Sequence, residues 1–484
     1  MAELTKKSLF LAGREAERAE LEDAFLSNRA ELIVVHGRRR VGKTYLVRAA
    51  YQRHLCFELT GMRDASLKVQ LDNFTRSLSQ RVDYTLRAST SWVDAFELLK
   101  RYLAGELSKG ERKVVFLDEL PWLASARSGF LSALDHFWNT FGSRQPSLIL
   151  VICGSAASWM IVNVLHHKGG LHNRVTRSVA LKPFNLCETH AFLNGRGIQL
   201  EPDQTLELYM AMGGIPYYLD YIRKGRSAAQ TIDALYFSAN APLREEFTQL
   251  YASLFEHHER HLKVIRALAR KHSGLTRQQL RDETGFSTGG ALTTVLSELE
   301  STGFILRTIP FGREHRDAQF RLVDAFTLFH LRWAATRTHD SPYWIHRRST
   351  PAGTAWAGYA FENVCLSHVR QIKKALGISG ILTEDSSWQH RARSKDAQGA
   401  QIDLLIDRPD GAVNLCEMKH SNAPFVINKK YAKWLRERAE VFRRVTNTPK
   451  TLFNTFITTR GVTRNEYATE LVATQVTAAA LFEA

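Results

Sequence analysis

Residues suited to binding phosphate occur in one short stretch near the start of the chain. The segment GRRRVGKT (residues 37–44) follows the apolar run 32–35 and precedes a helical pattern. A loop of this spacing turns backbone N–H groups toward phosphate, while its lysine reaches the terminal phosphates and its threonine hydroxyl reaches Mg²⁺. The spacing predicts a nucleotide-binding loop whose contacts come from Gly37, Arg38, Arg39, Arg40, Val41, Gly42, Lys43, Thr44 and Tyr45.

A second apolar run is followed by the carboxylates that such a loop requires. In KVVFLDELPWL, four apolar residues (114–117) precede Asp118 and Glu119. We expect Asp118 to join Thr44 around Mg²⁺, and Glu119 to orient and deprotonate the attacking water. A third run, SLILVICGS, ends in Ser155, which is placed to sense the γ-phosphate, although Gly-Ser after a strand is also an ordinary turn.

Another set of charged residues lies near the end of the chain, in QIDLLIDRPDGAVNLCEMKHS (residues 401–421). Side chains alternate along a strand, so Glu417 and Lys419 should share a face, and the turn RPDG should bring Asp403 beside Glu417. Burying these carboxylates without a cation is costly, and Mg²⁺ removes the conflict. An upstream amphipathic helix carries Glu362. These residues predict a second metal site.

The elements around these residues divide the chain into three expected domains, at residues 1–240, 250–335 and 350–484. The middle domain has three helical patterns followed by the strands FILRTIP and AQFRLVD, which predicts a winged helix. Such domains often dock on DNA through the third helix, but here that helix is poor in cations and carries Glu298 and Glu300. DNA docking and a role as an internal spacer both stay open for this domain.

Composition limits the class of protein further. The formal net charge of +16 predicts an anionic partner, most simply nucleic acid. The five cysteines lie far apart with no CxxC pair, which argues against a disulfide framework and against a zinc site. Neither a signal peptide nor a membrane span is recognisable, so we expect a cytoplasmic protein without a membrane partner.

The motifs of residues 9–219 occur in a recognisable order. LAGRE, GRRRVGKT, FLDELPWL, LDHFWN, CGSAASWM, GGLHNRVTRSVALKPFNLCE and GGIPYYL follow one another. This order resembles the AAA+-related predicted ATPases of bacteria and archaea, often called archaeal-type ATPases, which are related to the signal-transducing ATPases with numerous domains. The resemblance implies an α/β P-loop ATPase fold with a helical lid, ATP as ligand and a homo-oligomer formed through the ATPase domain.

The same resemblance makes Arg174 a candidate arginine finger, with Arg177 as the competing choice. It also implies that the segment 213–219 caps the lid helices near the nucleotide. The alternative for both arginines is a solvated or phosphate-contacting pair, because a finger normally acts across a subunit interface.

The C-terminal residues resemble the PD-(D/E)XK restriction-endonuclease-like nucleases, which have an α/β fold. The resemblance implies that Asp403 and Glu417 bind Mg²⁺, or Mn²⁺, that Lys419 activates the hydrolytic water, and that Glu362 supports the metal. Gln401 and Ile402 stand where the name-giving pattern has a proline. A Glu–Lys pair on an exposed strand is the alternative interpretation.

Together these patterns predict an ATP-hydrolysing protein coupled to a metal-dependent DNA nuclease. The family resemblance alone implies a role in DNA processing or in defence against mobile elements. The basic segment VINKKYAKWLRERAEVFRRV near the second site is where a DNA backbone would lie, with RNA as the alternative partner. One rival is a nucleotide switch or DNA-binding scaffold whose nuclease fold does not cleave. Another is an ATP-driven protein remodeller, which the missing pore-loop signature disfavours.

Overall fold

The computed structural model describes residues 12–83, 85–165, 170–287, 289–335, 342–390 and 399–484. Contacts divide the chain into two compact units, residues 1–183 and 184–484. The stretch 184–240, which the sequence placed with the first domain, belongs to the second unit in this division. The three domain boundaries expected from the sequence stay a prediction.

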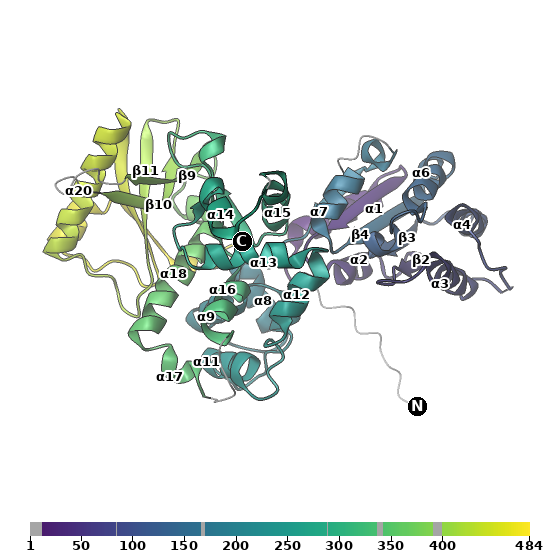
Figure 1. Cartoon of the computed structure of the whole chain (residues 1–484), viewed down its shortest axis with the longest axis horizontal. Coiled ribbons are helices and arrows are strands. Elements are labelled where there is room, and N and C mark those ends of the chain that lie inside the picture. The colour runs from purple at the N-terminus through teal and green to yellow at the C-terminus, as the bar shows by residue number, and fades with distance from the viewer. Residues whose placement is uncertain (1–11, 84, 166–169, 288, 336–341, 391–398) are drawn as a thin grey trace. The chain divides into compact units, whose positions relative to one another are not determined.

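A parallel sheet in the order β2-β3-β4-β1-β5 forms the centre of the first unit (Figure 1). The strands are β1 (Glu31–His36), β2 (Leu55–Thr60), β3 (Lys113–Asp118), β4 (Leu148–Gly154) and β5 (Arg177–Ala180). β1 and β4 are buried along their whole length, as expected for a parallel sheet covered on both faces. Because β4 pairs with both β1 and β3, the carboxyl ends of these three strands meet at one edge.

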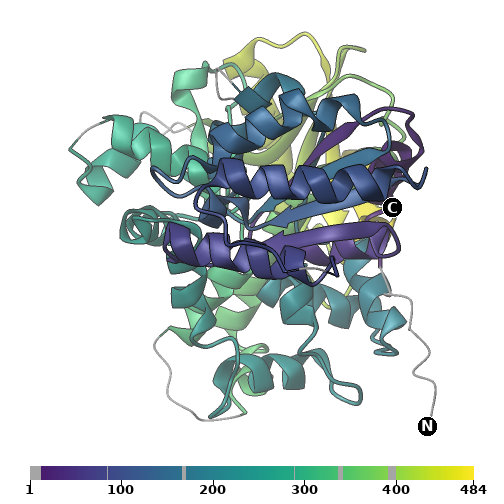
Figure 2. The ribbon, with the colours of Figure 1, turned by 90° about the vertical axis from the view of Figure 1, so that its right-hand side faces the viewer.

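Helices cover this sheet, and Figure 2 looks onto those that lie across it. One face packs on α3 (Leu67–Ser79), α4 (Trp92–Leu107) and α6 (Phe130–Thr140) through an aromatic core that includes Phe74 and Phe96. The other helices of regular length are α1 (Glu15–Leu26) and α2 (Lys43–Tyr51). Short helices α5 (Leu120–Leu123) and α7 (Ala157–Met160) follow β3 and β4.

The second unit begins with helices and continues into a small antiparallel sheet. The first helices are α8 (Leu186–Gly195), α9 (Pro202–Met212), α10 (Pro216–Leu219), α11 (Ala228–Ile232) and α12 (Glu246–Leu254). Next come α13 (His258–Ala269), β6 (Leu275–Thr276), α14 (Arg277–Thr284), α15 (Gly289–Ser301), β7 (Ile305–Thr308) and β8 (Gln319–Leu322). The expected pairing of the last two strands is confirmed, and β6 adds a third strand in the order β6-β8-β7. The hydroxyl of Thr276 caps α14 by accepting a hydrogen bond from the backbone N–H of Gln279.

A mixed five-stranded sheet in the order β13-β12-β11-β10-β9 forms the C-terminal part of this unit. Its strands are β9 (Glu384–His390), β10 (Ala400–Asp407), β11 (Ala412–Lys419), β12 (Thr451–Thr458) and β13 (Thr474–Thr477). β9, β10 and β11 are antiparallel neighbours, whereas β12 and β13 run parallel to β11. The helices here are α16 (Ala325–Phe329), α17 (Trp344–Arg347), α18 (Pro351–Ser367), α19 (Val369–Ala375), α20 (Lys429–Thr446) and α21 (Glu466–Leu471). Figure 1 places α20 beside β10 and β11.

Among the helices of the described residues, none is both long enough and apolar enough to cross a lipid bilayer.

His368 links the C-terminal part of the second unit to α8. Its ring is 1% exposed, and Nε2 accepts a hydrogen bond from the backbone N–H of Leu186 at 3.1 Å. Nδ1 lies 2.8 Å from the carbonyl oxygen of Val364, so the neutral tautomer protonated at Nδ1 satisfies both contacts. Burial lowers the pKa of His368 from 6.5 to about 4. The link therefore requires an uncharged ring.

We expect this link to weaken as the pH falls from 6.5 toward 4. Because the folded-state pKa of His368 lies below the unfolded value, the unfolded state takes up the proton first, and the stabilisation present above pH 6.5 is lost on acidification. Hydrogen exchange of peptides covering residues 184–200 and 360–376, corrected for intrinsic rates, should show less protection at pH 5 than at pH 7. His368→Gln keeps an acceptor for Leu186 without titrating, so its protection should change less with pH. An unchanged pH dependence in this variant would contradict the assignment.

Candidate functional site

The loop between β1 and α2 has the backbone that phosphate binding requires. Gly37 has φ +148° and Gly42 has φ +91°, both in the region that favours glycine. A Cβ on Gly37 would lie 2.2 Å from the carbonyl oxygen of Leu181, so no other residue fits there without a shift of the backbone. α2 begins at Lys43, so the unpaired N–H groups of its first turn face the loop.

Lys43 is 5% exposed and reaches across the inside of the loop. Its Nζ donates to the carbonyl oxygens of Gly37 and Arg38 at 2.9 and 3.0 Å, and to Oγ of Ser155 at 3.1 Å. Burial and the nearby Lys43 charge lower the pKa of His36, so that ring stays neutral beside the loop. The ammonium group of Lys43 is thus the charge available to terminal phosphates at this point.

Asp118 and Thr44 come together as the sequence expected. Thr44 Oγ1 donates to Asp118 Oδ2 at 2.7 Å, across the ends of α2 and β3. Asp118 Oδ1 accepts from the backbone N–H of Glu119 at 2.9 Å, which fixes the carboxylate. A hydroxyl beside a carboxylate is the oxygen donor set that Mg²⁺ prefers, so these residues fit a nucleotide-bound Mg²⁺.

Glu119 is held by Ser155 at the end of β4. Ser155 Oγ donates to Glu119 Oε1 at 2.6 Å, and the backbone N–H of Ser155 donates to Oε2 at 3.2 Å. Ser155 also receives the bond from Lys43, so a continuous hydrogen-bonded chain runs from the loop lysine to the glutamate. The backbone of Glu119 has φ +49°, an uncommon conformation for a residue with a side chain.

The remaining loop residues take different positions. Arg38 and Val41 are buried, whereas Arg39 and Arg40 are half-buried and Tyr45 is 39% exposed. The backbone of Arg40 also has positive φ, at +71°.

Arg14, for which no role was predicted, contacts the same loop. Arg14 is 4% exposed, lies at the N-cap of α1 with φ +61°, and donates from Nη2 to the carbonyl oxygen of Val41 at 3.2 Å. Gly61 is a second residue without an assigned role, because a Cβ there would lie 2.6 Å from the carbonyl oxygen of Glu119. The only sequence signals for these two were the GRE triplet and a glycine directly after a strand.

Arg174 and Arg177 have different environments. Arg177 forms ion pairs with Glu20 at 2.9 Å and Asp23 at 2.7 Å, and a longer one with the buried Glu31 at 3.6 Å. Arg174 ends a 3-10 turn and is exposed, and among the described residues no ion pair of its side chain is found. Of the two arginines, Arg174 is the one whose guanidinium is available to another molecule.

In the C-terminal part, Glu362 of α18 and Asp403 of β10 lie around one cation. Arg321 of β8 donates from Nη2 to Glu362 Oε2 at 3.0 Å, and its Nη1 lies 3.9 Å from Asp403 Oδ1. Burial and the charge of Asp403 raise the pKa of Glu362, whereas Arg321 and Lys419 lower it. Arg321 therefore brings these two predicted metal ligands together around its guanidinium group.

Glu417 belongs to a second network on β11 and α20. Its carboxylate accepts from Arg438, from Lys419 Nζ at 2.8 Å and from the hydroxyl of Tyr431 at 2.5 Å. Although burial alone raises the pKa of Glu417, these partners, Arg438 above all, bring it below its ordinary value. Glu417 is a buried, fully neutralised carboxylate.

Asp403 and Glu417 lie at neighbouring positions of the β10–β11 hairpin, because Leu404 pairs with Cys416. Their side chains have different partners, Arg321 near Asp403 and Arg438 on Glu417. On its other side, the register of β10 against β9 shifts between Ile402 and Leu405. Whether Asp403 and Glu417 share a metal ion stays a prediction. Within the described residues there is no group of three or more His, Cys, Asp or Glu side chains placed to hold a metal ion.

The basic segment of the C-terminal part forms α20. Apart from Glu440 and Val445, its exposed residues are six cations and one half-exposed aromatic side chain: Lys429, Lys430, Lys433, Trp434, Arg436, Arg443 and Arg444. Of these, Arg436 is paired with Glu470 at 2.6 Å. We call these seven residues the α20 basic face.

Residues 11–222 match the model of a family described as an ATPase domain predominantly from Archaea. The match begins before the phosphate-binding loop and ends beyond α10, so it includes the whole first site. It confirms the expected archaeal-type ATPase domain in this stretch of the chain.

Similar proteins extend over more of the chain. Uncharacterized protein MJECL04 of Methanocaldococcus jannaschii is 24% identical over 397 residues, which cover 81% of this chain and 83% of that protein. The Walker-type ATPase PABY2304 of Pyrococcus abyssi is similar with a TM-score of 0.49 and 18% identity, over 66% of this chain and 96% of that one. The ORC2 protein of Aeropyrum pernix is similar with a TM-score of 0.41 and 16% identity, over 66% and 93% of the two chains.

Proposed function

We propose that the ATPase domain hydrolyses ATP through Glu119 as general base, with Lys43 and Ser155 on the γ-phosphate and with Thr44 and Asp118 around Mg²⁺. The observation that carries these roles is the hydrogen-bonded chain Lys43–Ser155–Glu119 beside the Thr44–Asp118 pair. It brings a cation, a hydroxyl and a carboxylate to the edge of the sheet where the phosphate-binding loop lies.

Each residue then has a defined task in the reaction. Glu119 holds a water molecule with one carboxylate oxygen and accepts its proton as the water oxygen bonds to the γ-phosphorus and the bond to the β-phosphate oxygen breaks. Lys43 turns from the loop carbonyls to the phosphate oxygens, and Ser155 donates to the same group. Mg²⁺, when bound, neutralises developing negative charge on the phosphates.

Arg174 is proposed as a finger that a second copy of the chain supplies. Arg174→Ala should lower ATP turnover by about 10³-fold or more without weakening ATP binding, because the finger acts on transition-state charge. Mixing this variant with Glu119→Gln should recover turnover at sites that combine an intact Glu119 with an intact Arg174. Arg177→Ala is the matched control, since its ion pairs to α1 predict lost stability with turnover retained. Normal ATP turnover in Arg174→Ala would show that Arg174 is not the finger. Loss of turnover in Arg177→Ala alone would assign the finger to Arg177.

The C-terminal part is proposed to be a metal-dependent nuclease joined to the ATPase by a winged helix. Supporting observations are the order α18-α19-β9-β10-β11-α20-β12 around a mixed sheet and the contacts of Arg321 with both Glu362 and Asp403. Two carboxylates beside each other require a cation, and their oxygen atoms fit Mg²⁺ or Mn²⁺. Asp403 and Glu362 would hold the metal, while Lys419 would orient water toward a phosphodiester.

DNA is the proposed partner of this second site. The α20 basic face belongs to the same domain and offers cations to a phosphate backbone, with Trp434 available for stacking on a base. The net charge of +16 agrees with such a partner. RNA is the alternative, and a switch or scaffold that binds DNA without cutting it is the rival function.

The test is incubation of the purified full chain with supercoiled plasmid, ATP and either Mg²⁺ or Mn²⁺. Conversion to nicked or linear DNA that EDTA prevents is the expected result. Tight, salt-sensitive DNA binding without any cleavage, under every metal condition and in every variant below, would favour the scaffold.

A further inference from the structure

Arg321 comes from outside the five-stranded sheet that carries Asp403. It lies on β8 of the three-stranded sheet, and its side chain is 9% exposed. The guanidinium group lies over the ring of Tyr359 of α18, 4.9 Å from the ring centre, and reaches Glu362 one turn further along the helix. Arg321, from the three-stranded sheet, thus contacts two carboxylates, those of Glu362 on α18 and Asp403 on β10.

The contact is incomplete for a buried ion pair. Arg321 makes one hydrogen bond to Glu362, its approach to Asp403 is 3.9 Å, and its buried Nε has no hydrogen-bond partner among the described residues. A permanent buried arginine pair gains most from bidentate bonds and from satisfying every N–H group. Arg321 neutralises the charge of the two carboxylates but forms only one hydrogen bond with them. This favours a contact in which another cation can replace Arg321.

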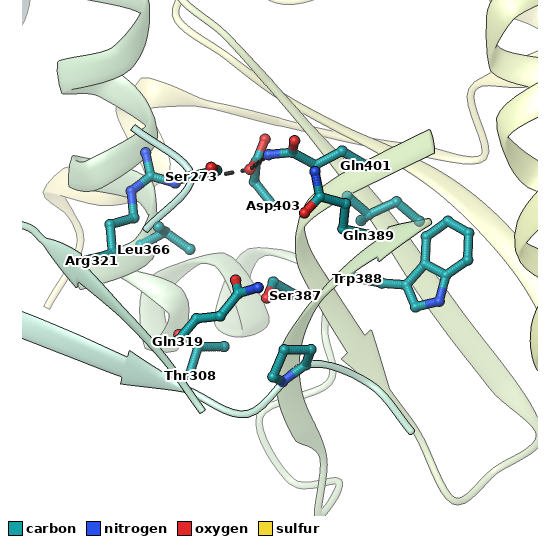
Figure 3. A pocket seen from close by; sticks show the side chains of 12 residues that line it. Ser273, Thr308, Gln319, Arg321, Leu366, Ser387, Trp388, Gln389, Gln401 and Asp403 are labelled. Carbon is teal, nitrogen blue, oxygen red and sulfur yellow. Dashed lines mark hydrogen bonds and ion pairs between the residues drawn. The ribbon is translucent and has the colours of Figure 1, made fainter. Parts of the chain in front are cut away.

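A pocket of about 30 Å³ lies beside the guanidinium and is lined by polar groups. Arg321 and Asp403 both line it, together with the polar side chains Ser273, Gln319, Ser387 and Gln401. Figure 3 shows Arg321 beside Asp403 in this lining, and Gln401 is hydrogen-bonded to Asp403 at 2.7 Å. Phe311, after β7, donates its N–H to the carbonyl oxygen of Ser387 of β9 at 2.8 Å, which joins the two sheets. The guanidinium group thus has polar groups other than the two carboxylates next to it.

We infer that Arg321 is an internal competitor of the divalent cation: it occupies the Glu362–Asp403 cluster and must swing away before a metal ion binds there. This inference rests on the proposed nuclease function of that cluster. A guanidinium and a divalent ion compete for these two carboxylates, because each neutralises the same negative charge and the two cations repel each other. Arg321 therefore restrains cleavage in the resting chain.

The test measures metal binding and cleavage separately. Free Mn²⁺ is followed by electron paramagnetic resonance in the absence of nucleotide, and plasmid cleavage is followed with the same protein. Arg321→Gln should bind one Mn²⁺ at least about tenfold more tightly than the wild-type chain, and should cleave faster. Arg321→Lys keeps the charge and should resemble the wild type. Arg307→Gln, an exposed arginine of β7 in the same small sheet, is the matched control and should change neither.

Adding Asp403→Asn to Arg321→Gln should abolish the gain in Mn²⁺ affinity, which would assign that gain to the Glu362–Asp403 cluster. Unchanged ATP turnover in these variants checks that the ATPase domain is folded. Wild-type and Arg321→Gln chains that bind Mn²⁺ equally and cleave equally would overturn the competition while leaving the nuclease function intact. Tighter Mn²⁺ binding in Arg321→Gln without cleavage would support the competition and overturn the nuclease. An equal rise in Mn²⁺ affinity in Arg321→Gln and Arg321→Lys would also overturn the competition. The cause would then be the lost packing of the arginine side chain and not the loss of its charge.

Discussion

Glu119→Gln should lower the turnover number for ATP by about 10²- to 10⁴-fold while ATP still binds, because the amide keeps its shape but cannot accept the proton of water. Ser155 can still donate to the amide oxygen, so the chain from Lys43 stays intact. The measurement is phosphate release at saturating ATP, together with ATP affinity from fluorescence of a labelled analogue. Glu97→Gln, an exposed glutamate on α4, should behave like the wild type.

In the same two measurements, Lys43→Ala should mainly lower the affinity for ATP, whereas Glu119→Gln should mainly lower turnover. It removes a buried ammonium that three oxygen atoms hold in the loop, so the affinity for ATP should fall by about 2–5 kcal/mol, roughly 30- to 3,000-fold. Normal ATP affinity in this variant would show that the loop is not the nucleotide site. Normal turnover in Glu119→Gln would show that another group activates the water.

The first site was predictable because its parts are local in sequence. The loop, the strand before it and the helix after it lie within about twenty consecutive residues, and each carboxylate or hydroxyl directly follows an apolar run that forms a strand. Parallel strands bring their carboxyl ends to one edge, so Asp118 and Ser155 had to arrive near Lys43 once the strands were neighbours. That β4 lies between β1 and β3 was not visible in the sequence, because strand order depends on how the whole sheet packs.

Arg14 and Arg321 mark the limit of such reasoning. Each acts on a site that lies far away in sequence, through one long side chain whose direction depends on tertiary packing. The hairpin pattern correctly predicts that Asp403 and Glu417 occupy neighbouring positions of β10 and β11. It does not reveal Arg321 as a partner of Asp403, because β8 belongs to another sheet. Glu417 likewise acquired Arg438 as a partner only because α20 packs on the sheet.

Asp403→Ala and Lys419→Ala should each reduce metal-dependent cleavage of plasmid DNA by about 10²-fold or more, because one holds the metal and the other orients the attacking water. The double variant should be no worse than either single one, since both residues act on the same phosphodiester. The effects should be largest when these substitutions are made in the Arg321→Gln variant, because Arg321 then no longer occupies the Glu362–Asp403 cluster. Asp410→Asn, an exposed carboxylate in the turn of the same hairpin, should leave cleavage unchanged.

Glu417 requires a milder change than alanine, because its carboxylate neutralises the buried Arg438. Glu417→Ala would leave that guanidinium unpaired at a cost of about 3–5 kcal/mol, so loss of cleavage would then reflect unfolding. Glu417→Gln keeps the shape of the side chain and one acceptor oxygen for Arg438, while its NH2 group faces Tyr431, whose hydroxyl oxygen can accept from it. If Glu417 binds the metal after Arg321 withdraws, this variant should lose both the Mn²⁺ signal and cleavage; if its role is structural, both should persist. ATP turnover should continue in all of these variants, and cleavage at the wild-type rate by Asp403→Ala would assign the nuclease activity to a contaminant or to another site.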